Sequence, residues 1–213
     1  MAHTQLLPGQ RGPADHAMHE RVVEAAHAMF SARGFARTSV AEIAADLDVA
    51  PTYLYKFFQS KAAIGEAVCS NILGGIDEAL WQVARSQADP DRKVMQLFRT
   101  MLKESVGMFF AERKLHDLVA QSLEQNWSSI ARHQQQIRAV VAHIVDEGVE
   151  KRAFDPELDR DEAVEALFWA LYPFAHPRVL EQSIDQDLEA RARIIGRFCV
   201  RALRGNTAKL VTD

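Results

Sequence analysis

The chain has 213 residues, enough for one or two domains with a buried core, and its apolar fraction of 48% is that of an ordinary globular protein. It has no apolar run of the roughly 18 residues that a spanning helix needs, so we expect no membrane segment. The net charge is −4, and the first 60 residues hold five basic side chains (Arg11, Arg21, Arg33, Arg37, Lys56) against six acidic ones (Asp15, Glu20, Glu24, Glu42, Asp46, Asp48). Bulk charge therefore gives no argument for nucleic-acid binding.

Two cysteines, Cys69 and Cys199, lie far apart within apolar helical patterns. This arrangement argues against a disulfide framework and against a zinc site built on paired cysteines. We expect both to be small buried hydrophobic groups in a protein of the reducing cytoplasm.

Helical spacing of apolar residues runs through almost the whole chain and strand patterns are nearly absent, so the sequence predicts an all-α fold. A first helix follows Asp15 and stops at Gly34. Ser39 and Glu42 form a capping box that opens a short second helix, which ends near Asp48. Pro51 is a natural first position for a third helix. Ser60 can cap a longer fourth helix that reaches about residue 83.

The same spacing continues in residues 89–111, 113–126, 127–152, 159–174 and 186–204. We expect a flexible leader at 1–14, a helix-turn-helix domain at 15–60, a second helical domain at 61–205, and a tail at 206–213.

The two short helices between residues 39 and 57 are too short to persist alone in water, so they must pack on the first and fourth helices. A helix-turn-helix does this and leaves the outer face of its second helix free to enter a major groove. We expect Leu54 to point into the core and Thr52, Tyr53, Tyr55 and Lys56 to surround the exposed side. Hydroxyl and ammonium groups of this kind bind phosphates and base edges.

The segments GFARTSVAEIA (34–44) and VAPTYLYKFFQSK (49–61) resemble the DNA-binding signature of the tetracycline-repressor (TetR-type) family, and the similarity covers about residues 16–70. It implies a transcriptional regulator that binds a double-stranded DNA operator through Thr38, Ser39, Thr52, Tyr53, Tyr55, Lys56 and Lys61. Two positions depart from the pattern, because Asp48 replaces a turn glycine and Ala50 replaces a capping serine or threonine. Asp tolerates the left-handed conformation, and the missing cap costs about 1 kcal/mol.

The resemblance also implies a C-terminal bundle with a ligand pocket and a dimer interface on its last two helices. The interface candidates share helical spacing and are Val164, Leu167, Leu171, Leu188, Ile195, Phe198 and Ala202. An intramolecular core is the other interpretation of that spacing. The pocket candidates are bulky apolar residues of the middle helices: Phe98, Met101, Phe109, Trp127, Phe168 and Tyr172, with Met108, Phe110 and Trp169 nearby. They suit a small hydrophobic or aromatic effector, although ordinary core packing explains the same pattern.

Histidines suggest no metal site. His143, Asp146 and Glu147 share one helical turn and His116 precedes Asp117, but neither set has a metal-ligand signature, so we expect surface polar residues and no cofactor. No catalytic motif occurs, and we expect no enzyme. A repressor released from a palindromic operator by its effector is the favoured function. A DNA-binding regulator without an effector and an all-helical carrier or enzyme are the alternatives.

Overall fold

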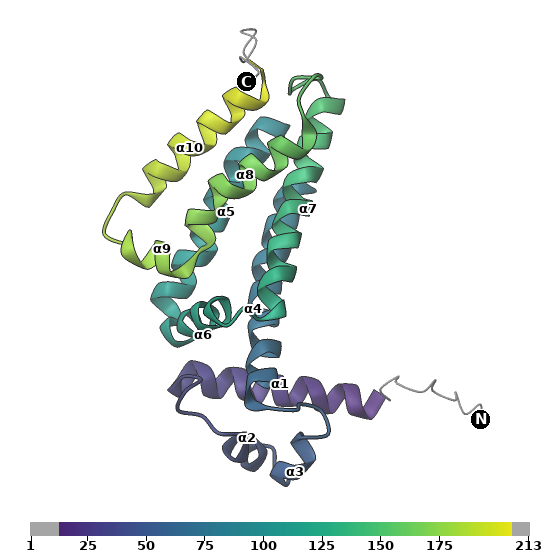
Figure 1. Ribbon diagram of the computed structural model, residues 1–213, viewed down its shortest axis with the longest axis vertical. Coiled ribbons are helices and arrows are strands. Elements are labelled where there is room, and N and C mark those ends of the chain that lie inside the picture. Colours follow the sequence, from purple (N-terminus) through teal and green to yellow (C-terminus); the bar gives the residue numbers. More distant parts are fainter. Residues whose placement is uncertain (1–12, 206–213) are drawn as a thin grey trace, which may run out of the picture.

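The computed structural model describes residues 13–205, and this part of the chain forms helices joined by turns, with no strand (Figure 1). The helices are α1 (Pro13–Arg33), α2 (Val40–Asp46), α3 (Pro51–Leu54), α4 (Lys61–Ala84), α5 (Pro90–Ala111), α6 (Arg113–Glu124), α7 (Ser128–Glu150), α8 (Arg160–Ala175), α9 (Pro177–Gln182) and α10 (Leu188–Leu203). Figure 1 shows α1, α2 and α3 at one end of an elongated molecule, with α4 rising from them into a bundle of α5 to α10. No helix of residues 13–205 is long and apolar enough to cross a membrane.

The smaller end has a core of its own. Its buried side chains come from α1, α2, α3, the turn after α3 and the first turns of α4 and α6, and they include Val22, Ala26, Phe30, Ile43, Ala44, Leu54, Phe58, Ile64, Val68, Leu115 and Leu118. Because α2 and α3 have only seven and four residues, this shared core must hold them in place.

Local signals define both short helices. The Ser39 hydroxyl accepts a hydrogen bond from the Glu42 backbone N–H at 3.2 Å, and the Glu42 carboxylate accepts one from the Ser39 N–H at 2.7 Å. Asp48 ends α2 with a φ of 55°, and the Val49 N–H donates to the Ala44 carbonyl at 3.0 Å. This is a Schellman motif, so aspartate serves in the turn position where glycine is common. Pro51 then occupies the first turn of α3, and Ala50 supplies no side-chain cap.

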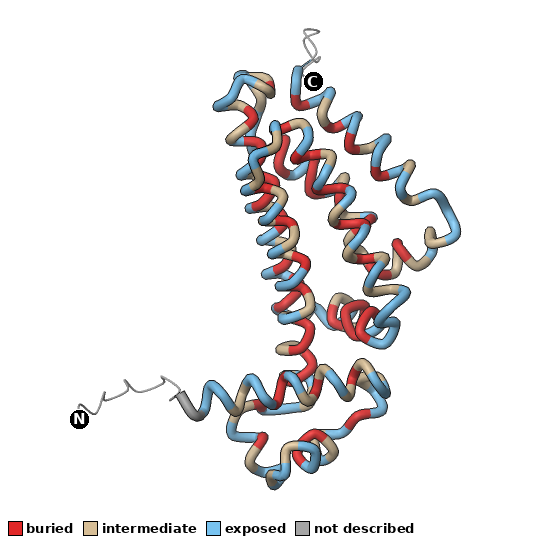
Figure 2. The backbone as a smooth tube through the Cα atoms, turned by 180° about the vertical axis from the view of Figure 1, so that it is seen from behind, coloured by how far each residue is buried: buried red, intermediate tan, exposed pale blue. Residues whose placement is uncertain are grey.

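The larger core fills the bundle. α7 packs along α4, α10 along α5, and α8 against both α5 and α7. Figure 2 shows buried positions along the inner sides of these helices. Both cysteines, Cys69 and Cys199, are buried here as free thiols.

α4 and α6 belong to both cores. Ile64 and Val68 of α4 pack in the smaller core, while Leu73 and Leu80 of the same helix pack in the larger one. α6 divides similarly, because Leu115 and Leu118 lie in the smaller core and Val119 in the larger core. The two ends of the molecule are therefore joined by continuous helices.

The all-α prediction is confirmed, and most helix boundaries agree within a few residues. Three details differ. α1 already begins at Pro13, α3 ends at Leu54 with turns over 55–57, and the short helix α9 was not expected. Most of the expected leader and the whole expected tail lie outside the described residues. The expected boundary at residue 60 separates the start of α4 from a core to which that segment contributes Ile64 and Val68.

Candidate functional site

The turn from α2 to α3 presents one face of α3 at the end of the molecule. Leu54 is fully buried and anchors α3 in the smaller core. Thr52, Tyr55 and Lys56 are exposed, and Tyr55 leaves 52% of its surface accessible, which is unusual for a large aromatic side chain. Figure 1 shows α2 and α3 at the tip farthest from the bundle, where no other part of the drawn molecule covers them.

Tyr53 and Lys56 contact each other on this face. The Tyr53 ring is half-buried and meets the Phe57 ring edge to face, with ring centroids 5.3 Å apart. The Lys56 ammonium lies 5.1 Å from the centroid of the Tyr53 ring, a cation–π geometry. Thr52, Tyr55 and Lys56 are thus exposed and Tyr53 is half-buried, while their contact with DNA stays a prediction.

The other three residues predicted to contact DNA make hydrogen bonds within the chain. Thr38 is only 2% exposed, and its hydroxyl donates to the Gly34 carbonyl at 3.0 Å, so it does not present a free hydroxyl to a phosphate in this structure. Ser39 is exposed, but its hydroxyl already belongs to the capping box. The Lys61 ammonium donates to the Ala36 carbonyl at 3.3 Å and lies over the Phe35 ring, and burial lowers the pKa of Lys61.

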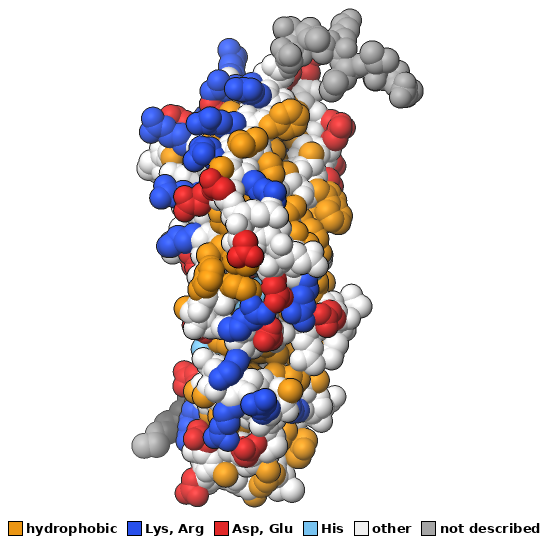
Figure 3. Space-filling view, turned by 90° about the vertical axis from the view of Figure 1, so that its left-hand side faces the viewer, with side chains coloured by type: hydrophobic (Ala, Val, Ile, Leu, Met, Phe, Trp, Pro, Cys, Tyr) orange, Lys and Arg blue, Asp and Glu red, His pale blue; other side chains and the backbone are white. Residues whose placement is uncertain are grey.

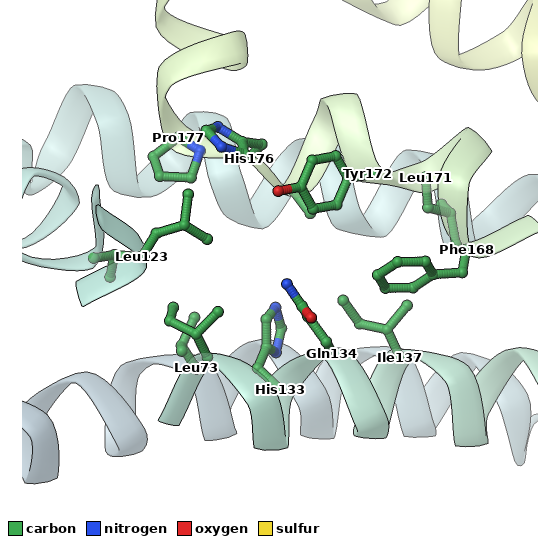
Figure 4. Close-up of a pocket in the computed structure, with 13 residues that line it drawn as sticks. Leu73, Leu123, His133, Gln134, Ile137, Phe168, Leu171, Tyr172, His176 and Pro177 are labelled. Atoms are coloured by element: carbon green, nitrogen blue, oxygen red, sulfur yellow. The ribbon is translucent and has the colours of Figure 1, made fainter. Parts of the chain in front are cut away.

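Two small adjoining cavities lie in the bundle and are lined by residues of α4 to α9. The larger has a volume of about 30 Å³ and is lined by Leu73, Val119, Leu123, Ile130, His133, Gln134, Ile137, Phe168, Leu171, Tyr172, Ala175, His176 and Pro177. Figure 4 shows Tyr172, His176 and Pro177 facing His133, Gln134 and Ile137 of α7 across this space. The second has a volume of about 10 Å³, shares His133 and Pro177 with the first, and adds Met101, Ser105, Met108 and His116.

Polar groups line these cavities, yet no Lys, Arg, Asp or Glu side chain does. The His133 ring nitrogen Nδ1 lies 2.6 Å from the Asp77 carboxylate of α4, which fixes that ring. His176 caps α9 by accepting from the Val179 N–H, and burial lowers the pKa of His176. The lining is that of a largely apolar site with a few hydrogen-bonding groups.

Two parts of the chain match models of known protein families. Residues 22–68 match the family model described as "Bacterial regulatory proteins, tetR family", and residues 90–195 match the model "Tetracyclin repressor-like, C-terminal domain". The chain belongs to the tetracycline-repressor family. It is therefore a transcriptional regulator, and the enzyme or carrier alternative is wrong.

Individual members of the TetR family share only a modest sequence identity with this chain. The HTH-type transcriptional repressor KstR2 of Mycobacterium tuberculosis is 27% identical over 142 residues, which cover 66% of this chain and 70% of that protein. The fatty acid degradation regulator FadR of Bacillus halodurans has the same fold, with a TM-score of 0.65 at 20% identity over 92% of this chain and all of that one. FadR of Bacillus subtilis, solved in complex with stearoyl-CoA, gives a TM-score of 0.62 at 17% identity over 85% of this chain and 97% of that one.

The predicted ligand residues divide between the cavity walls and other positions. Met101, Phe168 and Tyr172 line the cavities, whereas Phe98 does not and instead packs against Phe174. Phe109 also lies outside both linings and contacts His116 edge to face. Sequence reasoning missed the polar lining of His133, Gln134 and His176, for which helical spacing gives no signal.

Trp127 lies at the junction of the two cores. Its ring meets Phe35 edge to face, with centroids 5.9 Å apart, beside Gly65 of α4. A Cβ atom at Gly65 would lie 2.6 Å from Phe35 and 2.9 Å from Trp127, so only glycine permits this approach. Trp127 lines neither of the two cavities, and its expected place in a ligand pocket stays a prediction.

Two expectations about surface histidine and acidic groups also need correction. His116 is 1% exposed and Glu147 is half-buried against Lys93, whereas His143, Asp146 and Asp117 are exposed. Across residues 13–205, no group of three or more His, Cys, Asp or Glu side chains is placed to hold a metal ion.

The interface candidates also separate by burial. Val164, Leu167 and Leu171 of α8 are buried inside the chain's own core, so they are not available to a second copy. Of the candidates on α10, Leu188 and Ile195 are partly buried while Ala202 and Phe198 are exposed. Phe198 has 72% of its surface accessible, and Ile194 of the same helix has 63%. The predicted helix α8 is confirmed, but its three candidate residues face the chain's own core and leave other positions of α8 for a second copy.

Proposed function

We propose that two copies of this chain bind a palindromic DNA operator as a repressor, and that a small hydrophobic effector entering the bundle releases it. The exposed face of α3, with Thr52, Tyr55 and Lys56 at the tip, is the observation that carries the DNA half of this proposal. Such a regulator works in the cytoplasm, where bacterial DNA lies.

Dimerisation is proposed through α8 and α10. Trp169 of α8 and Ile194 and Phe198 of α10 are large apolar side chains with most of their surface exposed. Figure 3 shows hydrophobic side chains among many Lys and Arg on one flank of the bundle. An isologous contact would bury such side chains on both copies at once. Two α3 helices must then lie about 34–36 Å apart to enter successive major grooves, which predicts a palindromic site.

Binding-site selection from random duplexes tests the DNA half. We expect the selected sites to be palindromic, and a single asymmetric half-site would contradict the dimer. On the selected site, Lys56→Gln removes one phosphate contact from each copy. Because each contact contributes about 0.9 to the slope of log affinity against log salt, the slope should become shallower by about two.

Lys103→Gln is the matched control for that measurement. Lys103 lies on α5 in the bundle and its side chain is 80% exposed, so its loss should leave the salt slope unchanged. Equal slopes for Lys56→Gln and the unsubstituted protein would refute the proposed placement of α3 on the phosphates.

The effector half rests on the position of α6. His116 and Val119 of this helix line the cavities, while Leu115 and Leu118 of the same helix pack in the smaller core. The cavities hold only about 30 and 10 Å³, whereas drug-sized ligands occupy sites of roughly 300–1,000 Å³. An effector therefore has to separate the surrounding helices. A shift of α6 would disturb its packing on α1 and so change the geometry of the DNA-binding end.

A ligand changes operator affinity only if it binds the open and closed states unequally. We would screen compounds by thermal shift and test each hit for release of the selected DNA by fluorescence anisotropy. Hits that raise the melting temperature and weaken DNA binding support the proposal. If no compound changes DNA affinity, the chain is a regulator without an effector.

A further inference from the structure

His116 of α6 is a buried polar group without a partner. Its side chain is 1% exposed, and neither ring nitrogen has a hydrogen-bond partner among residues 13–205. The edge-to-face contact with Phe109, at 5.0 Å between ring centroids, fixes the plane of the ring but supplies no hydrogen bond. Buried polar groups are nearly always paired, so this histidine needs an explanation.

The ring lines the smaller of the two cavities. Ser105 of α5 and His133 of α7 line the same space, and both are buried. Because His133 is already engaged by Asp77, it is held in a fixed orientation beside the cavity. His116 and Ser105 thus contribute hydrogen-bonding groups to a lining that also holds several apolar side chains.

The charge state of His116 limits what it can bind. Burial lowers the pKa of His116, and the Arg113 cation lowers it further, so the imidazole is neutral at pH 7. A neutral imidazole offers one N–H donor and one nitrogen acceptor. Since no Lys or Arg side chain lines either cavity, a carboxylate there would lose its hydration without gaining a counter-charge.

We propose that His116 binds an uncharged oxygen, a hydroxyl or a carbonyl, of an otherwise hydrophobic effector. This inference rests on the proposed effector site and adds the chemical class of the ligand. A carbonyl accepts from the imidazole N–H, while a hydroxyl can also donate to the opposite ring nitrogen. The oxygen would enter the space beside Ser105 as the helices separate around the apolar part of the ligand.

Matched bicyclic probes test this directly: the hydrocarbon tetralin, its alcohol tetralol, its ketone tetralone and the corresponding carboxylic acid. Binding to the full chain is measured by calorimetry without DNA, so the result does not depend on operator release. We expect the alcohol and the ketone to bind about tenfold more tightly than tetralin, and the carboxylate no more tightly than tetralin.

His116→Leu puts an apolar side chain of moderate size in place of the imidazole and so removes both ring nitrogens. We expect it to lower the affinity for the ketone by about tenfold, leave tetralin binding unchanged, and preserve or raise the melting temperature of the free protein. His143→Leu is the matched control, because His143 lies exposed on α7 outside both cavities, and it should change none of these values.

NMR of the imidazole nitrogens in the unsubstituted protein keeps the test decisive if His116→Leu does not fold. The resonances of one histidine with a buried, neutral ring should move when the ketone is added and stay in place with tetralin. Equal affinities for ketone and hydrocarbon, no binding by any probe, or an unmoved resonance would mean that His116 only meets a buried water, and would overturn the inference. Probes that bind through His116 without releasing DNA would instead refute only the effector half of the proposed function.

Discussion

Lys93 of α5 is a buried lysine whose ammonium contacts two neighbouring helices of the bundle. Its side chain is 2% exposed, and its ammonium donates to the Glu147 carboxylate of α7 at 2.6 Å and to the Ala84 carbonyl at the end of α4 at 2.7 Å. One ammonium thus joins three helices. The Glu147 carboxylate is also paired with Lys151 at 2.6 Å.

We predict that Lys93→Met destabilises the fold by about 3 kcal/mol. Methionine fills much of the same volume, so the loss comes from the Ala84 carbonyl and the Glu147 carboxylate. Breaking a buried ion pair from one side costs about 3–5 kcal/mol, and the lower end applies because Glu147 keeps Lys151. For a chain of this size such a loss lowers the melting temperature by about 6–12 °C.

Urea denaturation followed by circular dichroism measures the free energy of unfolding at fixed protein concentration. The control is Lys103→Met on the same helix, where an exposed lysine should change stability by less than about 0.5 kcal/mol. The double variant with Glu147→Leu should lose less than the sum of the two single changes, because no carboxylate is then left buried with one partner missing. A loss below about 1 kcal/mol in Lys93→Met would refute this account of the ion pair.

Three further predictions concern the pairs, caps and surfaces described above. Burial raises the pKa of Glu147, but hydrogen bonds from Lys151 and Lys93 outweigh it and leave the pKa below its ordinary value of 4.5. The contribution of Glu147 to the free energy of unfolding is therefore complete above pH 4.5 and is lost as the pH falls through the lower pKa of the folded state. In urea titrations at decreasing pH, the stability of Glu147→Gln should therefore fall less steeply than that of the unsubstituted protein. Ser39→Ala should cost about 1 kcal/mol in the same assay, because it removes the cap of α2; an unchanged midpoint would contradict the capping box. If the chain forms the proposed dimer, Phe198→Glu should convert it to monomers in sedimentation velocity and abolish operator binding, whereas Gln186→Glu, an exposed change in the loop before α10, should do neither.

The sequence predicted the DNA-binding end well because its signals are local. The Ser39–Glu42 capping box, the turn at Asp48 and the proline at the start of α3 each act within a few residues of the chain. Burial of Leu54 followed from one requirement, that a very short helix must be anchored. The burial of Thr38 was not expected, and it too has a local cause, because its hydroxyl bonds to the carbonyl of Gly34.

The bundle was less predictable because helical spacing identifies a helix and leaves open which neighbour each face meets. Leu167 and Leu171 share the apolar face of α8, and nothing in the sequence tells whether that face meets α5 and α7 or a second chain. His116 has the same ambiguity. A histidine beside an aspartate suggests a surface pair, yet the register of α6 turns His116 inward and Asp117 outward. Such choices depend on the packing of six helices at once.

An acidic chain that binds DNA has to neutralise negative charge near the phosphates, and Glu42 shows how this one does so. Its carboxylate accepts hydrogen bonds from the N–H and hydroxyl of Ser39 and from Arg33, and the Ser39 N–H is the largest cause of its lowered pKa. The acid that caps α2 is thereby paired, but Asp48 remains exposed close to Lys56 in the chain. Residues 35–61 thus hold three basic side chains (Arg37, Lys56 and Lys61) against three acidic ones (Glu42, Asp46 and Asp48), so the tip carries no excess of positive charge. Because non-specific affinity grows with the number of phosphates neutralised, we expect weak binding to random DNA and a discrimination that depends on base contacts made by α3.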